Sequence, residues 1–252
     1  MLEFKNADIN IGRNEILRDI SVCFEKGRIT SVIGPNGCGK TTLLQSLIGL
    51  SSVKKGSILL DGEDYFSYKP RERAKRLSFM SQFRENTPNI TVAGLVEHGR
   101  FPHMGFARKM NADDRSAIER AIRLTGLYDE RDIPACELSG GMQQRAYLAM
   151  QLAQECPYMV FDEPMNHLDF PAQREMYGLI KKLNRDGITI IIVLHDLNHA
   201  LQISDNIVIM KNRAIEYTGT AKECLKTGII EQVFNCRIHS FESGNEMQYL
   251  IG

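Results

Sequence analysis

Short apolar runs recur along the chain at residues 17–24, 28–33, 57–60, 76–80, 158–161, 188–194 and 206–210. Runs of this length between turn-forming residues are typical of strands. A turn at Lys26-Gly27 splits the first two, whereas a stretch with helical spacing separates the runs at 158–161 and 188–194. The pattern predicts an antiparallel edge on the N-terminal side, joined to a parallel sheet with helices.

A stretch with a different pattern of apolar and turn-forming residues separates the runs at 76–80 and 158–161. Prolines and glycines punctuate it, and apolar residues such as Val92, Leu95 and Val96 recur at helical spacing. We therefore expect one domain over residues 1–252 with a helical subdomain inserted at 83–154. The basic run at 71–76 favours a solvated helix face over a phosphate or lipid contact. After Gly219, short helical and strand-like pieces alternate without a predicted role.

Composition limits the class of protein. The 252 residues suffice for one large α/β domain, and 31 basic residues balance 31 acidic ones, so no net charge draws the chain to nucleic acid or anionic lipid. The longest apolar run, 190–194, is far shorter than the ~20 residues of a membrane span. With no apolar signal core at the N-terminus, we expect a soluble chain that needs a partner for work at a membrane.

A glycine-rich turn between a predicted strand and a predicted helix carries the clearest chemistry. It reads GPNGCGKT at residues 34–41. Its backbone N–H groups can wrap a polyphosphate, while Lys40 neutralises the outer phosphates and the Thr41 hydroxyl is a ligand for Mg²⁺. The predicted nucleotide-binding residues here are Gly34, Pro35, Asn36, Gly37, Cys38, Gly39, Lys40, Thr41 and Thr42.

Six cysteines stand far apart without a C-x-x-C pair. This spacing argues against a zinc site or a disulfide scaffold and favours a reducing cytosol. Cys38 carries a separate hypothesis because it lies in the phosphate loop near a helix start. We expect its thiolate to be stabilised there, so that alkylating agents inactivate the protein unless nucleotide protects it.

Two adjacent carboxylates follow the run at 158–161. Asp162 and Glu163 would stand at the carboxyl end of a buried strand, beside the phosphate loop if the two strands are neighbours. One carboxylate can hold Mg²⁺ through water, and the other can accept a proton from the attacking water. We predict Asp162 as the metal residue and Glu163 as the base, in preference to a pair of acids that caps the next helix.

A second anion site is predicted in LSGGMQQR at residues 138–145. Ser139, Gly140 and Gly141 precede a helical pattern, so they would form a helix N-terminus with open N–H groups. A plain N-cap would explain the serine but not a second phosphate site. His195 follows the run at 188–194, on the predicted rim of the phosphates, with Asp196 as the cap of the next helix.

These stretches resemble the ATP-binding subunits of ATP-binding-cassette (ABC) transporters over nearly the whole chain, with a P-loop NTPase core of mixed sheet and helices. GPNGCGKT resembles their Walker A motif, LSGGMQQR their signature and YMVFDE their Walker B. Gln82 is similar to the Q-loop glutamine, residues 166–169 to the D-loop and His195 to the switch histidine. The resemblance implies ATP and Mg²⁺ as cofactors, with Gln82 at the metal and His195 as the γ-phosphate sensor. The catalytic set is then Lys40, Gln82, Glu163 and His195.

The same resemblance implies a pair of subunits arranged head to tail. The signature of one copy closes over the ATP held by the phosphate loop of the other. This chain has one of each, so it would act as a homodimer or beside a related subunit.

Three positions depart from the family pattern. Met142 replaces a glutamine behind the signature loop, Met165 replaces a small hydroxyl residue, and Ile11 stands where an aromatic ring usually covers adenine. We expect weaker polar contacts at the first two. From Ile11 we expect weaker, less purine-selective nucleotide binding.

The motifs GRFPH at 99–103 and LHDLNHA at 194–200 resemble those of importers for ferric siderophores, haem and cobalamin. This implies a membrane permease docked on the insertion and the Gln82 region, an extracytoplasmic substrate-binding protein, and a peripheral location on the cytoplasmic side of the cell membrane. The cargo does not touch such a subunit, so haem and cobalamin stay alternatives to ferric siderophore, which we favour as the largest group.

Two rival classes are a soluble ABC ATPase that acts on a macromolecular assembly and a non-hydrolysing nucleotide sensor. The first is disfavoured by the absence of tandem cassettes, a long coiled coil or a basic tail that would bind nucleic acid. The second is disfavoured by Glu163 and His195.

Overall fold

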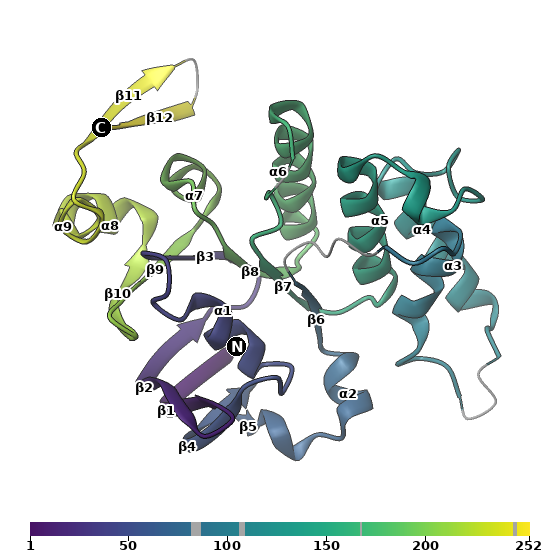
Figure 1. Cartoon of the computed structure of the whole chain (residues 1–252), viewed down its shortest axis with the longest axis horizontal. Coiled ribbons are helices and arrows are strands. Elements are labelled where there is room, and N and C mark those ends of the chain that lie inside the picture. Colours follow the sequence, from purple (N-terminus) through teal and green to yellow (C-terminus); the bar gives the residue numbers. More distant parts are fainter. Residues whose placement is uncertain (82–86, 106–108, 167, 244–245) are drawn as a thin grey trace. The chain divides into compact units, whose positions relative to one another are not determined.

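The computed structural model describes residues 1–81, 87–105, 109–166, 168–243 and 246–252 (Figure 1). Gln82 and His167, which the sequence places in the Q-loop and D-loop, lie outside these residues. The chain divides into two compact units, one of Met1–Ser67 with Thr189–Gly252 and one of Tyr68–Ile188. Among the described residues, no helix is both long and apolar enough to cross a membrane.

An antiparallel sheet opens the first unit. Its strands are β1 (Leu2–Ile11), β2 (Asn14–Phe24), β4 (Ser52–Leu60) and β5 (Glu63–Asp64), in the order β2-β1-β4-β5, and the short helix η1 (Tyr65–Ser67) follows. The predicted antiparallel edge is therefore confirmed. It includes β1, which none of the predicted strands anticipates, and β4 begins at Ser52 rather than at position 57.

The second sheet of this unit is parallel at its centre. β3 (Ile29–Ile33) lies between β8 (Thr189–Val193) and β9 (Asn206–Lys211) and is parallel to both, while β10 (Ala214–Thr220) pairs antiparallel with β9. Every residue of β3 and β8 is buried, as expected for strands covered on both faces. β3 leads into α1 (Lys40–Ser46) and β8 into α7 (Leu197–Ile203), so the predicted parallel sheet is confirmed here.

The first unit ends in short elements, as the sequence predicts. These are α8 (Ala221–Thr227), α9 (Ile229–Phe234) and a hairpin of β11 (Ile238–Ser243) and β12 (Glu246–Ile251). A capping box starts α8, because Thr220 Oγ1 accepts from the backbone N–H of Glu223 and Glu223 Oε2 accepts from that of Thr220.

The second unit combines a pair of parallel strands with helices. β6 (Leu77–Met80) is parallel to β7 (Tyr158–Asp162); α2 (Pro70–Ala74) precedes β6 and α6 (Phe170–Arg185) follows β7. Between the strands lie α3 (Val92–Glu97), η2 (His98–Arg100), α4 (Ala112–Leu124), η3 (Ala135–Glu137) and α5 (Gly140–Ala153). No residue of α2 is buried, which fits the solvated face expected for the basic run.

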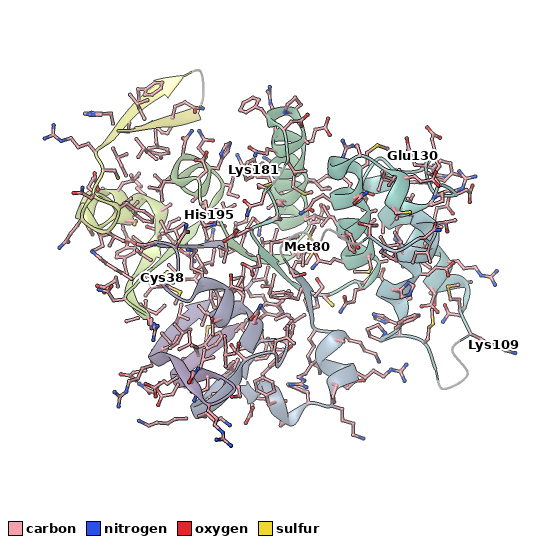
Figure 2. All side chains as sticks on the ribbon, viewed as in Figure 1. Cys38, Met80, Lys109, Glu130, Lys181 and His195 are labelled. Carbon is pink, nitrogen blue, oxygen red and sulfur yellow. The ribbon has the colours of Figure 1, made fainter. Side chains whose placement is uncertain are left out.

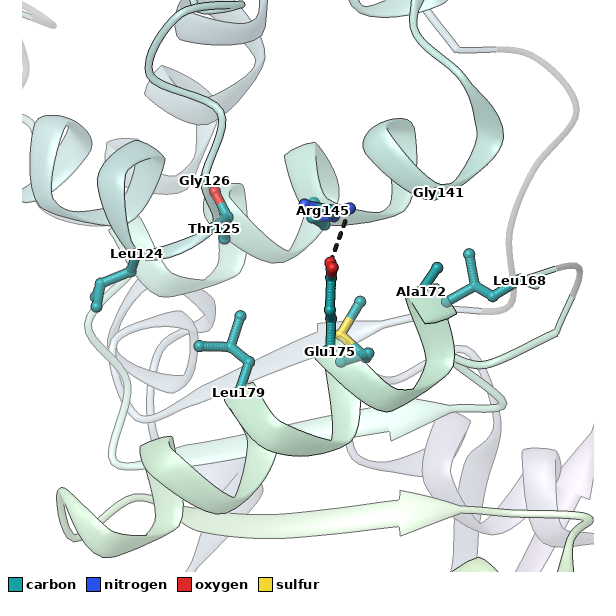
Figure 3. Close-up of a pocket in the computed structure, with 10 residues that line it drawn as sticks. Leu124, Thr125, Gly126, Gly141, Arg145, Leu168, Ala172, Glu175 and Leu179 are labelled. Atoms are coloured by element: carbon teal, nitrogen blue, oxygen red, sulfur yellow. Dashed lines mark ion pairs between the residues drawn. The ribbon is translucent and has the colours of Figure 1, made fainter. Parts of the chain in front are cut away.

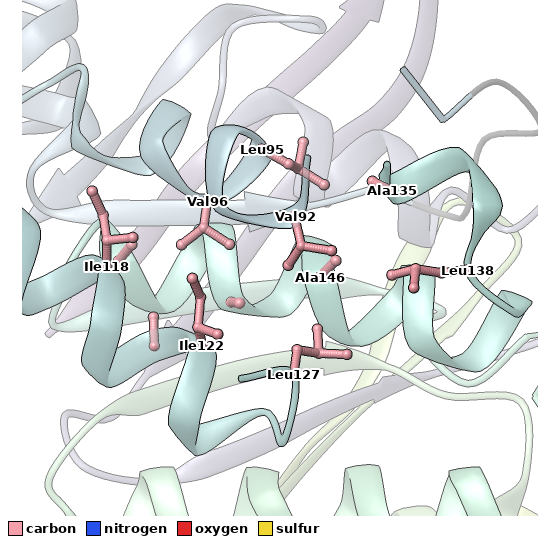
Figure 4. Packing of buried hydrophobic residues seen from close by; sticks show 12 residues of the cluster. Val92, Leu95, Val96, Ile118, Ile122, Leu127, Ala135, Leu138 and Ala146 are labelled. Atoms are coloured by element: carbon pink, nitrogen blue, oxygen red, sulfur yellow. The ribbon is translucent and has the colours of Figure 1, made fainter. Parts of the chain in front are cut away.

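Apolar side chains of α3, α4 and α5 pack into one cluster (Figure 4). Side-chain caps fix where two of these helices begin: Thr91 Oγ1 accepts from the N–H of Gly94 at 3.1 Å, and Asn111 Oδ1 from that of Asp114 at 2.8 Å. The buried members of the cluster are Val92, Leu95, Val96, Ile118, Ala121, Ile122, Leu127, Ala135, Leu138, Ala146, Ala149 and Ala153.

A buried arginine, Arg100, connects three helical elements beside this cluster through hydrogen bonds. Arg100 of η2 is 4% exposed, and its Nε donates to Asp114 Oδ1 at 2.9 Å. Its Nη1 donates to the carbonyl oxygen of Ala153 at 2.7 Å and to Glu155 Oε2 at 2.7 Å. Because these contacts join η2 to the start of α4 and the end of α5, the arginine of GRFPH has a structural role within the second unit.

Candidate functional site

The phosphate loop lies between β3 and α1, as the sequence predicts. Gly39 is the N-cap of α1 and has a left-handed backbone with φ 103°. A Cβ at Gly34 would collide with the carbonyl oxygen of Met210, and one at Gly39 with the side chain of Leu17. Glycine is therefore required at both positions for the loop to curl between its neighbours.

Lys40 is held against this loop and is only 5% exposed. Its Nζ donates to the carbonyl oxygens of Gly34 at 2.7 Å and Pro35 at 3.1 Å. The ammonium group thus stands within the loop, where a polyphosphate would meet it. Thr41 is exposed whereas Thr42 is buried, so Thr41 has the more accessible of the two hydroxyls.

Cys38, which is labelled in Figure 2, differs from the expected reactive thiol in its burial and in the pKa of its thiol. It is 4% exposed, and burial raises the pKa of its thiol above the ordinary value. The charge of Lys40 and backbone hydrogen bonds oppose this pKa shift without outweighing it. The prediction of a stabilised thiolate is wrong, because desolvation exceeds the attraction of the neighbouring positive charge.

His195 and the phosphate loop leave the parallel sheet at the same edge. β3 and β8 are adjacent, parallel and paired in register. Gly34 follows the end of β3, and His195 lies just after the end of β8, where it is exposed. The first unit thus brings together the phosphate loop and the predicted γ-phosphate sensor, at the carboxyl ends of two neighbouring strands.

Ile11 is the last residue of β1 and lies at the turn into β2. It pairs with Asn14 across the turn, and its side chain is 46% exposed. A large apolar side chain exposed at a hairpin end can cover a planar base. This exposure is compatible with the predicted adenine contact, although no ring is present to stack.

We expect Ile11→Tyr to tighten ATP binding by about 0.5–1.5 kcal/mol, because an aromatic ring adds stacking that an aliphatic side chain lacks. Calorimetric titration with ATP and with a pyrimidine triphosphate would measure the gain and its base preference. An affinity equal to that of the wild-type protein would show that Ile11 does not contact the base.

The predicted acid pair ends β7 in the second unit. Asp162 is the last residue of this strand and is 2% exposed, whereas Glu163 has a left-handed backbone with φ 53°, which is rare for a side chain of this size. Nδ2 of Asn166 donates to Glu163 Oε2 at 2.6 Å, and the Asn166 N–H donates to the Glu163 carbonyl oxygen at 3.3 Å. A strained turn thereby fixes the direction of the Glu163 carboxylate. The sequence placed Asn166 in the D-loop but did not predict this contact.

β6 and β7 share their carboxyl edge as well. Met80, the last residue of β6, is opposite Phe161 of β7, so the chain that continues from β6 leaves beside Asp162. Gln82 is two residues further on and lies outside the described residues.

Ser139 is exposed and is the N-cap of α5, with an extended backbone. Its side chain makes no capping hydrogen bond to this helix, although serine is a common cap. Gly140 and Gly141 form the first turn. The serine hydroxyl and the first N–H groups of α5 are thus left accessible to an anion, as the predicted second phosphate site requires.

A glutamine fastens the segment in front of Ser139. Gln143 Nε2 donates to the carbonyl oxygens of Leu138 at 2.9 Å and Cys136 at 3.4 Å, and Thr87 Oγ1 donates to Gln143 Oε1 at 2.7 Å. Met142, the family departure beside it, packs against the apolar cluster. The polar support of the signature loop therefore comes from Gln143, a position that the sequence analysis did not single out.

We expect Gln143→Leu to lower ATP turnover about 3- to 10-fold, because the loop would lose the three hydrogen bonds that hold it. Met142→Leu, which keeps an apolar side chain on the cluster, is the matched control and should retain turnover. Steady-state ATPase assays on both variants, with thermal unfolding to verify the fold, test this. Equal turnover in the two variants would exclude the role of Gln143.

Two further glutamines connect the signature helix and α6 to the turn after β7. Buried Gln144 donates from Nε2 to the carbonyl oxygen of Pro164 at 2.7 Å. Gln173 Nε2 donates to the carbonyl oxygens of Met165 at 3.4 Å and Leu168 at 3.0 Å. The turn that holds Glu163 is therefore attached to both α5 and α6. Gln144 belongs to the signature motif, whereas Gln173 stands in none of the motifs found in the sequence.

A cavity of about 210 Å³ lies behind the signature loop, between α5 and α6 (Figure 3). Gly141 and Leu168 border it, and an ion pair at 2.9 Å joins Arg145 Nη2 to Glu175 Oε2. Arg145 is the last residue of LSGGMQQR. Its partner lies on α6, so this solvent-exposed ion pair connects two helices of the second unit.

The candidate residues thus form two sets. The first unit holds Ile11, the phosphate loop and His195, and the second holds Asp162, Glu163 and the signature loop. The phosphate loop, His195 and the acid pair lie at the carboxyl ends of parallel strands. Ile11 lies instead at a hairpin turn, and the signature loop lies at the start of a helix. Their individual roles stay predictions.

Comparison with known proteins agrees with these motifs. Residues 17–166 match the protein family described as ABC transporter. The iron(3+)-hydroxamate import ATP-binding protein FhuC of Bacillus subtilis is 36% identical, over 92% of this chain and 87% of its own. The ferric enterobactin transport ATP-binding protein FepC of Escherichia coli is 36% identical, over 94% of this chain and 88% of its own.

Solved structures show the same fold. An inward-facing metal-chelate type ABC transporter superposes with a TM-score of 0.85 at 22% identity and covers 100% of this chain and 96% of that one. The dimeric bacterial ABC transporter cassette MJ0796 superposes with a TM-score of 0.75 at 26% identity. The match covers 88% of this chain and 99% of the MJ0796 chain. The predicted α/β P-loop fold is confirmed. With the family match over more than half of its length and relatives above 30% identity over most of it, this chain belongs to the ABC transporter family, as one of its ATP-hydrolysing subunits.

Proposed function

We propose that this chain powers the uptake of ferric siderophores through a membrane permease. The names of FhuC and FepC support the cargo class, since both denote subunits of iron-complex transport systems. The observation that carries the mechanism is one phosphate loop and one exposed signature loop in a single chain. Two copies, each supplying one half of each site, then enclose two molecules of ATP.

The phosphate-binding residues suit a magnesium nucleotide. Thr41 and Asp162 offer hard oxygen ligands of the kind that Mg²⁺ prefers, and Gln82 is a third proposed ligand. When bound, Mg²⁺ neutralises charge on the β- and γ-phosphates. Lys40 supplies the remaining positive charge, and the backbone of residues 34–42 surrounds the phosphates.

Glu163 acts as the general base of hydrolysis. Its carboxylate accepts a proton from a water molecule whose oxygen bonds to the γ-phosphorus, while the bond from that phosphorus to the β,γ-bridging oxygen breaks. ADP and phosphate leave. Asn166 holds the carboxylate in one direction through the 2.6 Å hydrogen bond, and His195 contacts the γ-phosphate from the edge of β3 and β8.

The exposed Ser139 hydroxyl and the Gly140 and Gly141 N–H groups close on the γ-phosphate of the partner copy. ATP thereby draws two copies together, and hydrolysis releases them. A helical subdomain at 83–154 transmits this motion to the permease on which it docks. In this proposal the chain is a homodimer on the cytoplasmic side of the membrane, and a substrate-binding protein outside delivers the cargo.

Haem and cobalamin importers remain alternatives, because the cargo does not touch the ATPase. A soluble ABC ATPase that remodels an assembly is the alternative of another class. Purification of the tagged chain from solubilised membranes separates these classes: a co-purified polytopic protein supports transport, and a soluble or nucleic-acid partner overturns it.

Cargo is then tested in proteoliposomes that contain the purified complex and its binding protein. ATP-dependent uptake of ⁵⁵Fe-labelled hydroxamate siderophore, without uptake of haem or cobalamin, is the result expected. Uptake of haem or cobalamin alone would replace the proposed cargo.

A further inference from the structure

The C-terminal hairpin β11–β12 has little core of its own. Its strands pair antiparallel from Ile238 opposite Ile251, yet Phe241 is 52% exposed and Leu250 is 62% exposed. A two-stranded hairpin is at best marginally stable in water unless it packs against another element. Its place in the first unit therefore depends on a neighbour.

That neighbour is α7. Gln202 Nε2 donates to Gln248 Oε1 of β12 at 2.6 Å, and the backbone N–H of Tyr249 donates to Asn198 Oδ1 at 3.3 Å. Gln202 Nε2 also donates to Asn198 Oδ1 at 3.1 Å. One oxygen of Asn198 thus accepts from both its own helix and the hairpin, and the three side chains form a single network.

α7 is the helix that directly follows His195. Asp196 is its N-cap and accepts from the N–H of His199 at 3.0 Å, as the sequence predicts. His195 directly precedes this N-cap, and Asn198 is the second residue of the helix, so one residue, Asp196, separates His195 from the start of α7. Leu197, Ala200, Leu201 and Ile203 are buried, so α7 is anchored in the unit on one side and carries the hairpin contacts on Asn198 and Gln202. A shift of α7 would therefore move the segment that bears His195.

We propose that the C-terminal hairpin positions His195 for the γ-phosphate, with Asn198 and Gln202 as positioning residues that act through α7. This rests on the proposed role of His195 in hydrolysis. The hairpin is distant in sequence from the phosphate loop and carries exposed side chains. A few hydrogen bonds attach it to α7, the helix that follows His195. It also gives the segment after Gly219 a function that the sequence pattern did not suggest.

The first test replaces the acceptor. Asn198→Leu removes the shared oxygen at similar volume, whereas Asn198→Asp keeps it and is the conservative control. We expect Asn198→Leu to lower kcat for ATP about 3- to 10-fold with an unchanged KM, and Asn198→Asp to restore kcat. Gln248→Leu on the exposed strand should lower kcat in the same way. Gln248→Leu leaves the sequence of α7 unchanged and removes only a contact of the hairpin, so a loss of kcat in this variant would not come from a misfolded α7. Unchanged kcat in both leucine variants would overturn the proposal.

The second test distinguishes positioning from general loosening of the fold. In a His195→Ala background, Gln248→Leu should have no further effect on kcat, because the group that it positions is gone. Equal fold-losses in the presence and absence of His195 would overturn the proposal while leaving the role of His195 intact. If His195→Ala itself retained full turnover, the proposed function of His195 would fail first, and the two failures are thus distinguishable.

Discussion

Replacing Glu163 by Gln lowers ATP turnover on the order of 10²- to 10⁴-fold while ATP still binds. The amide cannot accept the proton of the attacking water, but its oxygen can still accept the hydrogen bond from Asn166, so the strained turn is kept. Phosphate release measures turnover, and equilibrium binding of ATP measures affinity. Glu119→Gln, at an exposed position that pairs with Arg123, is the matched control and should behave as wild type.

The same variant should form a stable dimer in the presence of ATP. In the proposed mechanism hydrolysis separates the copies, so blocking it should leave the nucleotide enclosed between them. Sedimentation velocity with and without ATP reports the association state. A Glu163→Gln protein that binds ATP and stays monomeric would be incompatible with closure between two copies.

Replacing Arg100 by Met lowers the free energy of unfolding by about 3–5 kcal/mol, since removing one partner leaves the charge of Asp114 buried and unpaired. Urea denaturation measures this loss. The double variant Arg100→Met/Asp114→Asn should be more stable than Arg100→Met, because the buried charge is removed too. A loss below about 1 kcal/mol would mean that Arg100 does not hold the cluster of α3, α4 and α5 together.

Acid should weaken the same network. Burial alone would raise the pKa of Asp114, but hydrogen bonds from the N–H of Asn111 and from Arg100, with the charge of Arg100, hold this pKa below its ordinary value. Glu155 behaves likewise: burial alone would raise its pKa, but hydrogen bonds from Arg100 and Arg120 hold this pKa below its ordinary value.

A carboxyl group whose pKa is lower in the folded protein than in the unfolded chain stabilises the fold at pH values above its pKa in the unfolded chain. This stabilisation disappears as the pH falls through its pKa in the folded protein. We therefore expect unfolding free energy to decline below about pH 4.5, and the decline to be shallower in Arg100→Met. Denaturation midpoints between neutral and acid pH measure both slopes. Parallel slopes would show that Arg100 does not lower these pKa values.

Motifs with a fixed backbone requirement could be predicted from the sequence. The phosphate loop, the turn at Asp196 and the strands β3, β7, β8 and β9 each combine an apolar run with residues that only one local geometry satisfies. β1 could not be found in this way. Asn6 has a left-handed backbone, and the pairing with β2 shifts register beside it, so the alternation of buried residues changes phase within the strand.

Long-range polar contacts were the other part that the sequence did not predict. Gln144 and Arg100 stand in motifs, but their partners are carbonyl oxygens and carboxylates that only the fold brings near. The error at Cys38 has the same origin. Proximity to Lys40 is visible in the sequence, whereas the burial that outweighs it is a property of the packed loop.

The division of each ATP site between two copies is tested most directly by mixing two inactive variants. One variant, Lys40→Ala, lacks the phosphate-loop cation but has an intact signature loop. The other variant, Ser139→Arg, has a blocked signature loop but an intact phosphate loop. Neither variant should hydrolyse ATP alone. In the mixed dimer, the intact phosphate loop of one copy meets the intact signature of the other, so ATP hydrolysis should reappear. No recovery in a mixture shown to contain mixed dimers, or full activity of Ser139→Arg alone, would contradict the account.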